Sequence, residues 1–402
     1  MTRTAGVDWA SEAHEVCVVE DGEVIHRGEV LHDERGIASL CDRLEVLGVE
    51  RVAIERPDGV LVERLLGAGL EVLAIHPNQL AASRARYAIA RGKSDRFDAF
   101  VLAELARTDS HRFEALRPNS DQTKALRALT RSREELIATR VEIANQLRCH
   151  LEGFWPGAAR VFSSIDSPIA LAFLERYPTP ADARGLGEKR MDAFLARHGY
   201  SGGKTAPELL ARLRSAPVGT AGQAELMAKR TVVLGLVSAL SPIVAQVNEL
   251  GRQIREALAA HPDAAIFAPL FRSSTTAICP ATLIAELGDV RERYPTEAAL
   301  AADAGQCPVA VESGKRKVAS FRRACDKRLR DAIAILADST RRWHPWASEV
   351  YRRARERGQT HPHALRTLGR AWVRVLWRCW VDRVPYDPRL HGNLRRLEIE
   401  EG

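Results

Sequence analysis

Short apolar runs alternate with amphipathic stretches over the first 115 residues. In chain order the pattern predicts strands at 3–9, 14–20 and 23–32, a helix at 34–47, a strand at 51–55, a helix at 60–70, a strand at 71–77, and a helix from 95 to about 107. Asp21-Gly22 lies between two strands and favours a hairpin turn. Three strands in hairpin order, followed by alternating strand and helix, predict an α/β domain with a mixed sheet.

From residue 116 onward the periodicity becomes helical. Leucines and isoleucines at helical spacing predict one long helix at 119–155 and a second at 224–260, which suggests an antiparallel coiled-coil arm. The segment at 157–221 is rich in Pro and Gly and is expected to hold short helices at best.

A third region follows the arm. It is predicted to contain short helices at 280–287 and 296–304, a basic loop at 312–318, and longer helices at 321–343 and 363–381. We therefore expect three parts. They are an α/β domain of RNase H-like type at 1–115, a helical coiled-coil arm at 116–262, and a basic, predominantly α-helical C-terminal domain at 263–402.

Composition limits the class of protein. A hydrophobic fraction of 46% is that of a globular chain. The apolar runs, such as 231–240, are expected to be too short to span a bilayer, and no export signal is visible at the N-terminus. The 7 cysteines are scattered and lack CxxC spacing. This pattern favours reduced thiols, a cytoplasmic location and no membrane partner, and it disfavours a disulfide framework.

Positive charge is concentrated at one end of the chain. Residues 311–402 hold 22 Lys and Arg against 11 Asp and Glu, whereas residues 1–310 hold 37 against 41. Such a basic excess suits a polyanionic partner such as nucleic acid, although a solvated basic face has the same composition.

Four acids are the first candidate site. Asp8 and Glu55 end predicted strands, and Asp95 and Asp98 lie three residues apart on one helix face. Four such carboxylates gathered at one point would repel each other unless Mg²⁺, or alternatively Mn²⁺, lay between them. The alternative is a turn residue, a solvated strand end and a helix cap. The neighbouring basic residues Lys93 and Arg96 are expected either to contact phosphate or to balance the charge of the acids.

Ser313 is the second candidate. It precedes Gly314, and the pair allows a tight turn with an exposed hydroxyl. The basic residues around this serine suit phosphate contacts; they are Lys315, Arg316, Lys317, Arg322 and Arg323. On its own this pattern favours a turn serine in a basic loop, and Ser320, Ser273 and Ser274 are alternatives.

Together these strings resemble a known family. GVDWA at 6–10, Glu55, GKSDRFDA at 92–99 and GQCPVAVESGKR at 305–316 are similar to the DEDD transposases of insertion sequences, which are bridge-RNA-guided serine recombinases with a RuvC-like N-terminal domain. The resemblance covers nearly the whole chain and is most specific at its two ends. One stretch departs from it. At 276–282 this chain lacks the glycine-rich Pro-Gly-Ile-Gly hairpin usual in the family, which puts a backbone contact to phosphate there in doubt.

The resemblance implies a mechanism and partners. The four acids would bind the metal, and Ser313 would attack a DNA phosphodiester to give a covalent phosphoserine intermediate. Donor and target DNA, a structured guide RNA and a homo-oligomer of the tetramer-of-dimers type are implied as partners. The competing hypotheses are a Holliday-junction resolvase that uses water, a non-catalytic nucleic-acid-binding accessory protein, and an inactive relic of a mobile element.

The tryptophans and histidines of the C-terminal region are expected to have structural roles. The tryptophans at 343, 346, 372, 377 and 380 lie among arginines, and we expect apolar helix packing more than base stacking. The histidines at 344, 361 and 363 lack metal-ligand spacing and are expected to be surface or capping residues.

Overall fold

The structure is a computed structural model that describes residues 2–87, 94–219, 222–271, 277–313 and 316–390, with side chains described in these ranges except at 310–319 and 390. The chain forms two compact units, one of residues 1–120 with 290–293 and the other of residues 121–289 with 294–402. Each unit has its own buried apolar core.

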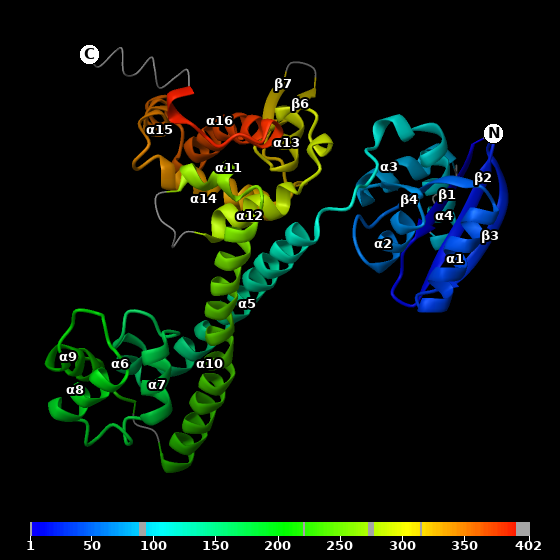
Figure 1. The fold of residues 1–402 in the computed structure, drawn as a ribbon. Coiled ribbons are helices and arrows are strands. Elements are labelled where there is room, and N and C mark those ends of the chain that lie inside the picture. Colours follow the sequence, from blue (N-terminus) through cyan, green and yellow to red (C-terminus); the bar gives the residue numbers. More distant parts are fainter. Residues whose placement is uncertain (1, 88–93, 220–221, 272–276, 314–315, 391–402) are drawn as a thin grey trace, which may run out of the picture. The chain divides into compact units, whose positions relative to one another are not determined.

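A mixed five-stranded sheet with the order β3-β2-β1-β4-β5 forms the centre of the first unit (Figure 1). Its strands are β1 (Arg3–Asp8), β2 (Ala13–Glu20), β3 (Glu23–Leu31), β4 (Val49–Ile54) and β5 (Glu71–Ala74). β1, β2 and β3 pair antiparallel, while β4 lies parallel to both β1 and β5. This confirms the predicted RNase H-like sheet. Asp21 and Gly22 both have positive φ, 52° and 92°, as the predicted hairpin turn requires.

Helices cover both faces of this sheet. They are α1 (Glu34–Val46), α2 (Val60–Gly67), α3 (Pro77–Tyr87) and α4 (Asp95–Thr108), followed by the short helix η1 (Ser110–Arg112). Leu40 and Leu65, from α1 and α2, share a core with Val7. Leu102 of α4 packs in a separate core with Leu73. α3 differs from the strand predicted to end at Pro77, because proline also suits the first position of a helix.

Gly6 lets α4 cross directly over β1. A Cβ atom built at Gly6 would lie 2.0 Å from the Ala99 carbonyl oxygen and 2.4 Å from the Ala103 backbone nitrogen. Both atoms belong to the backbone of α4, so no side-chain rotation could relieve the overlap. The absence of a side chain at Gly6 therefore sets the distance between the helix and the central strand.

Gly6→Ala should lower the free energy of unfolding of this unit by about 2 kcal/mol or more, because two backbones must separate. The matched control is Gly67→Ala at the end of α2, where an added Cβ meets nothing within 4 Å. That change should alter stability by less than about 1 kcal/mol. Urea unfolding of both variants measures the difference, and equal stability of the two would contradict the tight crossing.

A pair of histidines lies where β2 begins and β3 ends. His14 is fully buried, and its Nε2 lies 2.8 Å from Nδ1 of His32, while its Nδ1 accepts a hydrogen bond from the Ala10 N–H. Burial, and secondarily the charge of His32, lower the pKa of His14 from 6.5 to about 4. The folded unit therefore keeps His14 neutral at a pH where an unfolded chain would protonate it.

The pair predicts an acid-dependent loss of stability. A histidine pKa that is depressed in the folded state stabilises the fold fully above pH 6.5, and this contribution falls as the pH drops from 6.5 toward about 4. The loss amounts to at most about 3 kcal/mol. Denaturant melts at stepped pH should show the drop, and it should shrink in His14→Gln but persist in the exposed control His361→Gln. An unchanged drop in His14→Gln would contradict this assignment.

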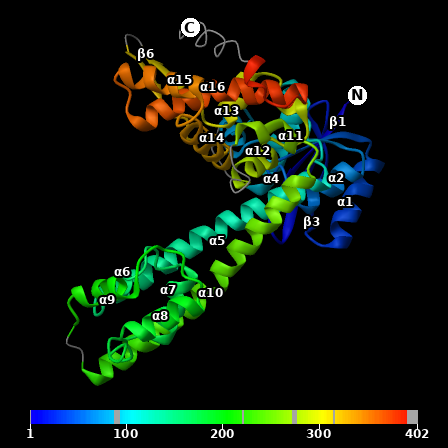
Figure 2. The same cartoon turned by 60° about the vertical axis from the view of Figure 1, so that its left-hand side comes forward.

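The arm of the second unit consists of α5 (Asp121–Glu152) and α10 (Gln223–Ala260), which lie side by side in Figures 1 and 2. This agrees with the predicted pair of long helices. Between them lie four short helices, α6 (Pro156–Arg160), α7 (Pro168–Arg176), α8 (Glu188–Arg197) and α9 (Ala206–Ser215). Phe173 and Phe194 are buried among these helices and share one core with Leu147 of α5 and Val237 of α10. The short helices are therefore packed onto the arm.

The expectation that no apolar segment could span a bilayer needs one correction. Within the part of the chain that the structure describes, α10 is the helix whose length and composition would allow it to cross a membrane, with an apolar window of mean hydropathy 1.6. Length and composition alone are weak evidence. The buried positions Val233, Val237, Leu240 and Val244 recur every three or four residues, the spacing of a helix packed against a neighbour.

The remaining elements form a helical C-terminal part. They are α11 (Ala264–Phe267), η2 (Ala268–Leu270), α12 (Ile278–Leu287), η4 (Arg291–Arg293, in the first unit), α13 (Glu297–Asp303), β6 (Val309–Ser313), β7 (Arg316–Ser320), α14 (Lys327–Thr340), α15 (Pro345–Glu356), α16 (His361–Asp382) and η5 (Pro388–Leu390). The predicted basic loop is thus a β-hairpin, and the helix expected at 321–343 begins only after Asp326, whose side chain caps α14. α15 was not predicted.

Apolar packing of the tryptophans is confirmed for three of them. Trp346, Trp372 and Trp380 are at most 5% exposed and belong to the C-terminal core. His344 caps α15 by accepting a hydrogen bond from the Ala347 N–H, as expected for a capping residue.

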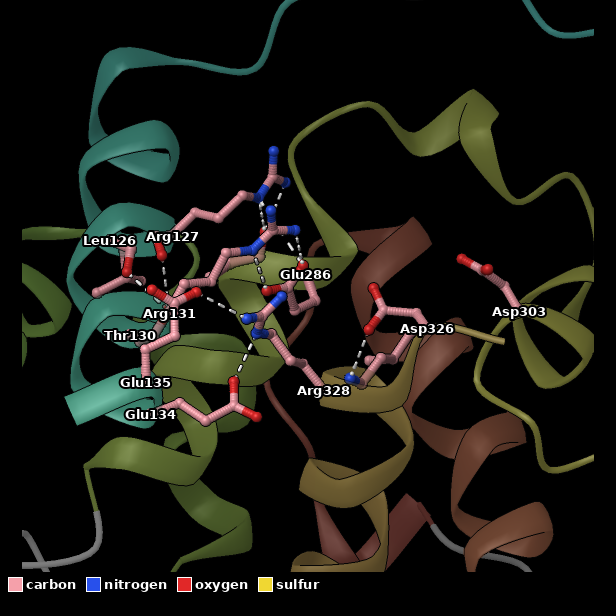
Figure 3. Close-up of polar contacts among 12 residues, drawn as sticks. Leu126, Arg127, Thr130, Arg131, Glu134, Glu135, Glu286, Asp303, Asp326 and Arg328 are labelled. Carbon is pink, nitrogen blue, oxygen red and sulfur yellow. Dashed lines mark hydrogen bonds and ion pairs between the residues drawn. The ribbon is translucent and has the colours of Figure 1, made fainter. Parts of the chain in front are cut away.

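A buried carboxylate joins the arm to the C-terminal helices (Figure 3). Glu286 of α12 is 1% exposed and accepts hydrogen bonds of 2.9 and 2.7 Å from the guanidinium of Arg131 on α5. Burial is the largest single effect and acts to raise the pKa of Glu286, but the Arg131 hydrogen bond and the charges of Arg131, Arg127 and Arg328 together hold this pKa below its ordinary value. Arg127 adds hydrogen bonds of 2.8 and 2.6 Å to the Ala285 carbonyl. Arg328 of α14 also reaches α5, through Glu134 at 2.5 Å.

Candidate active site

Two of the four predicted acids end neighbouring strands. Asp8 is the last residue of β1, and Glu55 directly follows β4. The two strands are parallel, and their last register pair is Val7 with Ile54, so the acids emerge next to each other at one edge of the sheet. The sheet topology brings together residues that are far apart in the sequence.

The third acid, Asp98, is placed near these strand ends by α4, which packs across one face of the sheet. It lies on the first turn of α4 next to Ala99, the residue that touches Gly6 of β1. Asp98 is only 2% exposed, so its charge requires a partner. That partner is Arg84 of α3, whose Nε and Nη2 donate hydrogen bonds of 2.5 and 2.7 Å to the two carboxylate oxygens. The bidentate geometry is the one that gives strong arginine–carboxylate pairs.

The charges of Asp8 and Glu55 also act on Arg84. Its hydrogen bonds to Asp98, together with the charges of Asp98, Glu55 and Asp8, raise the pKa of the guanidinium above its ordinary value, against a smaller opposing effect of burial. Arg84 thus pairs directly with Asp98, and the charges of Glu55 and Asp8 act on it as well. Among the described residues, no three His, Cys, Asp or Glu side chains are close enough to hold one metal ion. The acids are neighbours, but they do not form a closed coordination sphere.

The remaining predicted residues of this site lie further out. Asp95 is the first residue of α4 and is exposed. Arg96 forms a 3.4 Å ion pair with Glu15, so it balances an acid outside the predicted four. Lys93 lies outside the described residues. The structure thus gathers Asp8, Glu55 and Asp98, and leaves Asp95 exposed at the start of the same helix.

The chemistry of the donors suits a hard divalent cation. Asp8, Glu55 and Asp98 offer only carboxylate oxygens, the ligands that Mg²⁺ and Mn²⁺ take in proteins. The buried carboxylate of Asp98 already has a positive partner, the guanidinium of Arg84. The types of donor therefore suit a metal, but binding would require Arg84 to move aside and the three carboxylates to come closer together.

Ser313 lies at the tip of a hairpin. It ends β6 and pairs with Arg316, the first residue of β7, so the two strands are connected through residues 314 and 315, which lie outside the described part of the chain. The side chains of Ser313, Arg316 and Lys317, and all of Lys315, lie outside what the structure describes. A hairpin tip is a position where a hydroxyl can be presented to a large ligand. Of the alternative serines, Ser320 ends β7 and is exposed, whereas Ser273 and Ser274 lie outside the described residues.

The base of the hairpin carries the other predicted basic residues. Arg322 donates a 3.4 Å hydrogen bond to the Cys307 carbonyl, which links the two ends of the hairpin. Arg323 is exposed. Phe321 is 43% exposed and lies beneath two guanidinium groups, those of Arg330 and Arg366, at 5.9 and 5.3 Å from its ring centre.

Sequence reasoning missed Arg84 and Phe321. Arg84 belongs to a helix that was not predicted, and one arginine among the 59 Lys and Arg of the chain carries no signal of its own. Phe321 follows a predicted basic loop directly, and an aromatic residue flanked by arginines was the available hint.

Comparisons with known proteins agree with this architecture. Residues 5–156 match a family model described as a transposase, of the DEDD IS110 type, and residues 275–352 match one described as the transposase IS116/IS110/IS902 family. The mini-circle putative transposase for IS117 from Streptomyces coelicolor is 31% identical over 398 residues, which covers 96% of each chain. The uncharacterized 42 kDa protein of insertion element IS900 from Mycobacterium paratuberculosis is 28% identical over 96% of this chain and 97% of its own.

A solved structure, that of Thermus thermophilus RuvC in complex with a Holliday junction substrate, covers 29% of this chain and all of its own, at 17% identity and a TM-score of 0.24. Because this TM-score is so low, the family assignment rests on the sequence matches alone. These matches include both the predicted acids and the hairpin that carries Ser313. The chain belongs to the IS116/IS110/IS902 family of insertion-sequence transposases.

Proposed function

We propose that this transposase cuts and rejoins DNA through a covalent bond to Ser313, with a divalent metal held by Asp8, Glu55, Asp95 and Asp98. The proposal is supported by the placement of Asp8 and Glu55 at the ends of neighbouring parallel strands, and by the pairing of Asp98 with Arg84, whose pKa all three acids raise. Acidic groups placed next to one another with a perturbed ionisable partner are candidates for a functional site.

The chemistry is a displacement at phosphorus. The oxygen of Ser313 forms a bond to the phosphorus, the bond from phosphorus to one sugar oxygen breaks, and that oxygen takes up a proton as the new DNA end. Rejoining reverses the exchange, as a sugar hydroxyl of another strand displaces the serine. A bound divalent ion would supply charge stabilisation to the phosphate and lower the cost of forming the serine alkoxide.

The proposed partners are donor and target DNA, a structured guide RNA and further copies of the chain. The basic excess of residues 311–402 supports contact with a phosphate backbone. Lys93, Arg96, Lys315, Arg316, Lys317, Arg322 and Arg323 are proposed to make such contacts, and the exposure of Arg323 supports its inclusion. The guide RNA and the tetramer-of-dimers assembly rest on the family resemblance, with Mg²⁺ as the metal and Mn²⁺ as its substitute.

Ser313→Ala should abolish both strand cutting and adduct formation, because no other group would replace the attacking oxygen. Incubation with labelled DNA, denaturing electrophoresis and peptide mapping of the trapped adduct measure this directly. Ser320→Ala, in the same hairpin, is the matched control and should leave the adduct intact. Continued cutting by Ser313→Ala without an adduct would instead indicate water as nucleophile, as in a resolvase.

Asp98→Asn should lower the rate of cutting by about a hundredfold or more, since a buried metal ligand is lost while the side-chain volume is kept. Asp109→Asn is the matched control, because Asp109 also pairs with an arginine of α3, at 2.6 Å from Arg86, but lies outside the acid group. Circular dichroism would verify that both variants fold. Equal rates for Asp98→Asn and Asp109→Asn would exclude the acidic site from the reaction.

A further inference from the structure

Arg84 pairs with Asp98, the buried member of the predicted acid group. Its side chain is 25% exposed, whereas the Asp98 side chain that it contacts is 4% exposed, so the pair extends from solvent into the edge of the sheet. The same guanidinium lies within the electrostatic reach of Glu55 and Asp8. A single positive charge thus offsets the mutual repulsion of three carboxylates.

A guanidinium and a divalent ion cannot both occupy this position. The oxygens of Asp98 that would coordinate a metal are both engaged by Arg84, through Nε and Nη2. Like charges a few ångströms apart also repel strongly where solvent is partly excluded. A metal can therefore bind Asp98 only after the arginine has withdrawn.

We infer that Arg84 is a resident counter-ion that a divalent metal must displace, and that the released guanidinium then binds a DNA phosphate. This inference rests on the proposed function, because it assumes that the acids hold a metal. A guanidinium that leaves a carboxylate finds in phosphate a group with the same bidentate geometry. Metal and DNA would then bind cooperatively, since each favours the position of Arg84 that the other needs. The site would be protected from metal until substrate arrives.

The test compares Mn²⁺ binding by the full-length protein and two matched variants. Arg84→Gln removes the counter-ion, and Arg86→Gln removes an arginine of the same helix that pairs with Asp109 instead. Without DNA, Arg84→Gln should bind Mn²⁺ about tenfold more tightly than wild type or more, because the competing charge is gone. Arg86→Gln should bind Mn²⁺ as wild type does. Titration calorimetry and the electron paramagnetic resonance of free Mn²⁺ both measure this binding without any need for activity.

A short DNA duplex extends the test. In wild type it should tighten Mn²⁺ binding, while in Arg84→Gln this gain should be lost. Arg84→Lys keeps a positive charge without the bidentate fork, and without DNA it should bind Mn²⁺ at most about threefold more tightly than wild type.

Two results would overturn the inference. If Arg84→Gln binds Mn²⁺ more weakly than wild type, Arg84 assists metal binding rather than excluding the metal. If Arg84→Gln does not fold, the same comparison is made with Arg84→Lys. Equal Mn²⁺ affinities of Arg84→Gln and Arg86→Gln would show that Arg84 is no competitor. If neither wild type nor Arg84→Gln binds Mn²⁺, the metal site of the proposed function fails together with the inference, whereas Mn²⁺ binding by wild type alone overturns only the role of Arg84.

Discussion

Negative charge held at the edge of a sheet is the constraint on which this structure depends. Asp8 and Glu55 are neighbours because β1 and β4 are parallel neighbours, and Asp98 is added by a helix that crosses β1 at a glycine. Such a group is stable only when a cation lies within it. Arg84 supplies that cation here, through two hydrogen bonds to Asp98.

Close packing and chemistry are linked through Gly6. With a side chain at this position α4 would stand further from β1 and would carry Asp98 away from the strand ends. The acids therefore sit on rigid elements, a strand end and the first turn of a helix, which favours a defined geometry over a mobile one. The serine is placed differently, at the tip of a two-stranded hairpin between α13 and α14.

The sequence allowed much of this to be predicted, for identifiable reasons. Alternating apolar residues and the Asp21-Gly22 turn predicted the order of the strands, and the strand ends predicted where Asp8 and Glu55 would meet. Arg84 was missed because a long-range ion pair leaves no local pattern. The hairpin at 309–320 was taken for a loop because its many charges hide the alternation that marks a strand. Proline at 77 was ambiguous, since it both ends strands and begins helices.

The most direct measurement of the central claim is a crystal structure with Mn²⁺ and a DNA substrate, with the metal located by its anomalous scattering. The account predicts a peak bound by Asp8, Glu55 and Asp98, with the guanidinium of Arg84 turned toward a phosphate and the Ser313 oxygen beside the same phosphate. An Arg84 still paired with Asp98, and manganese bound elsewhere while DNA is in place, would contradict it.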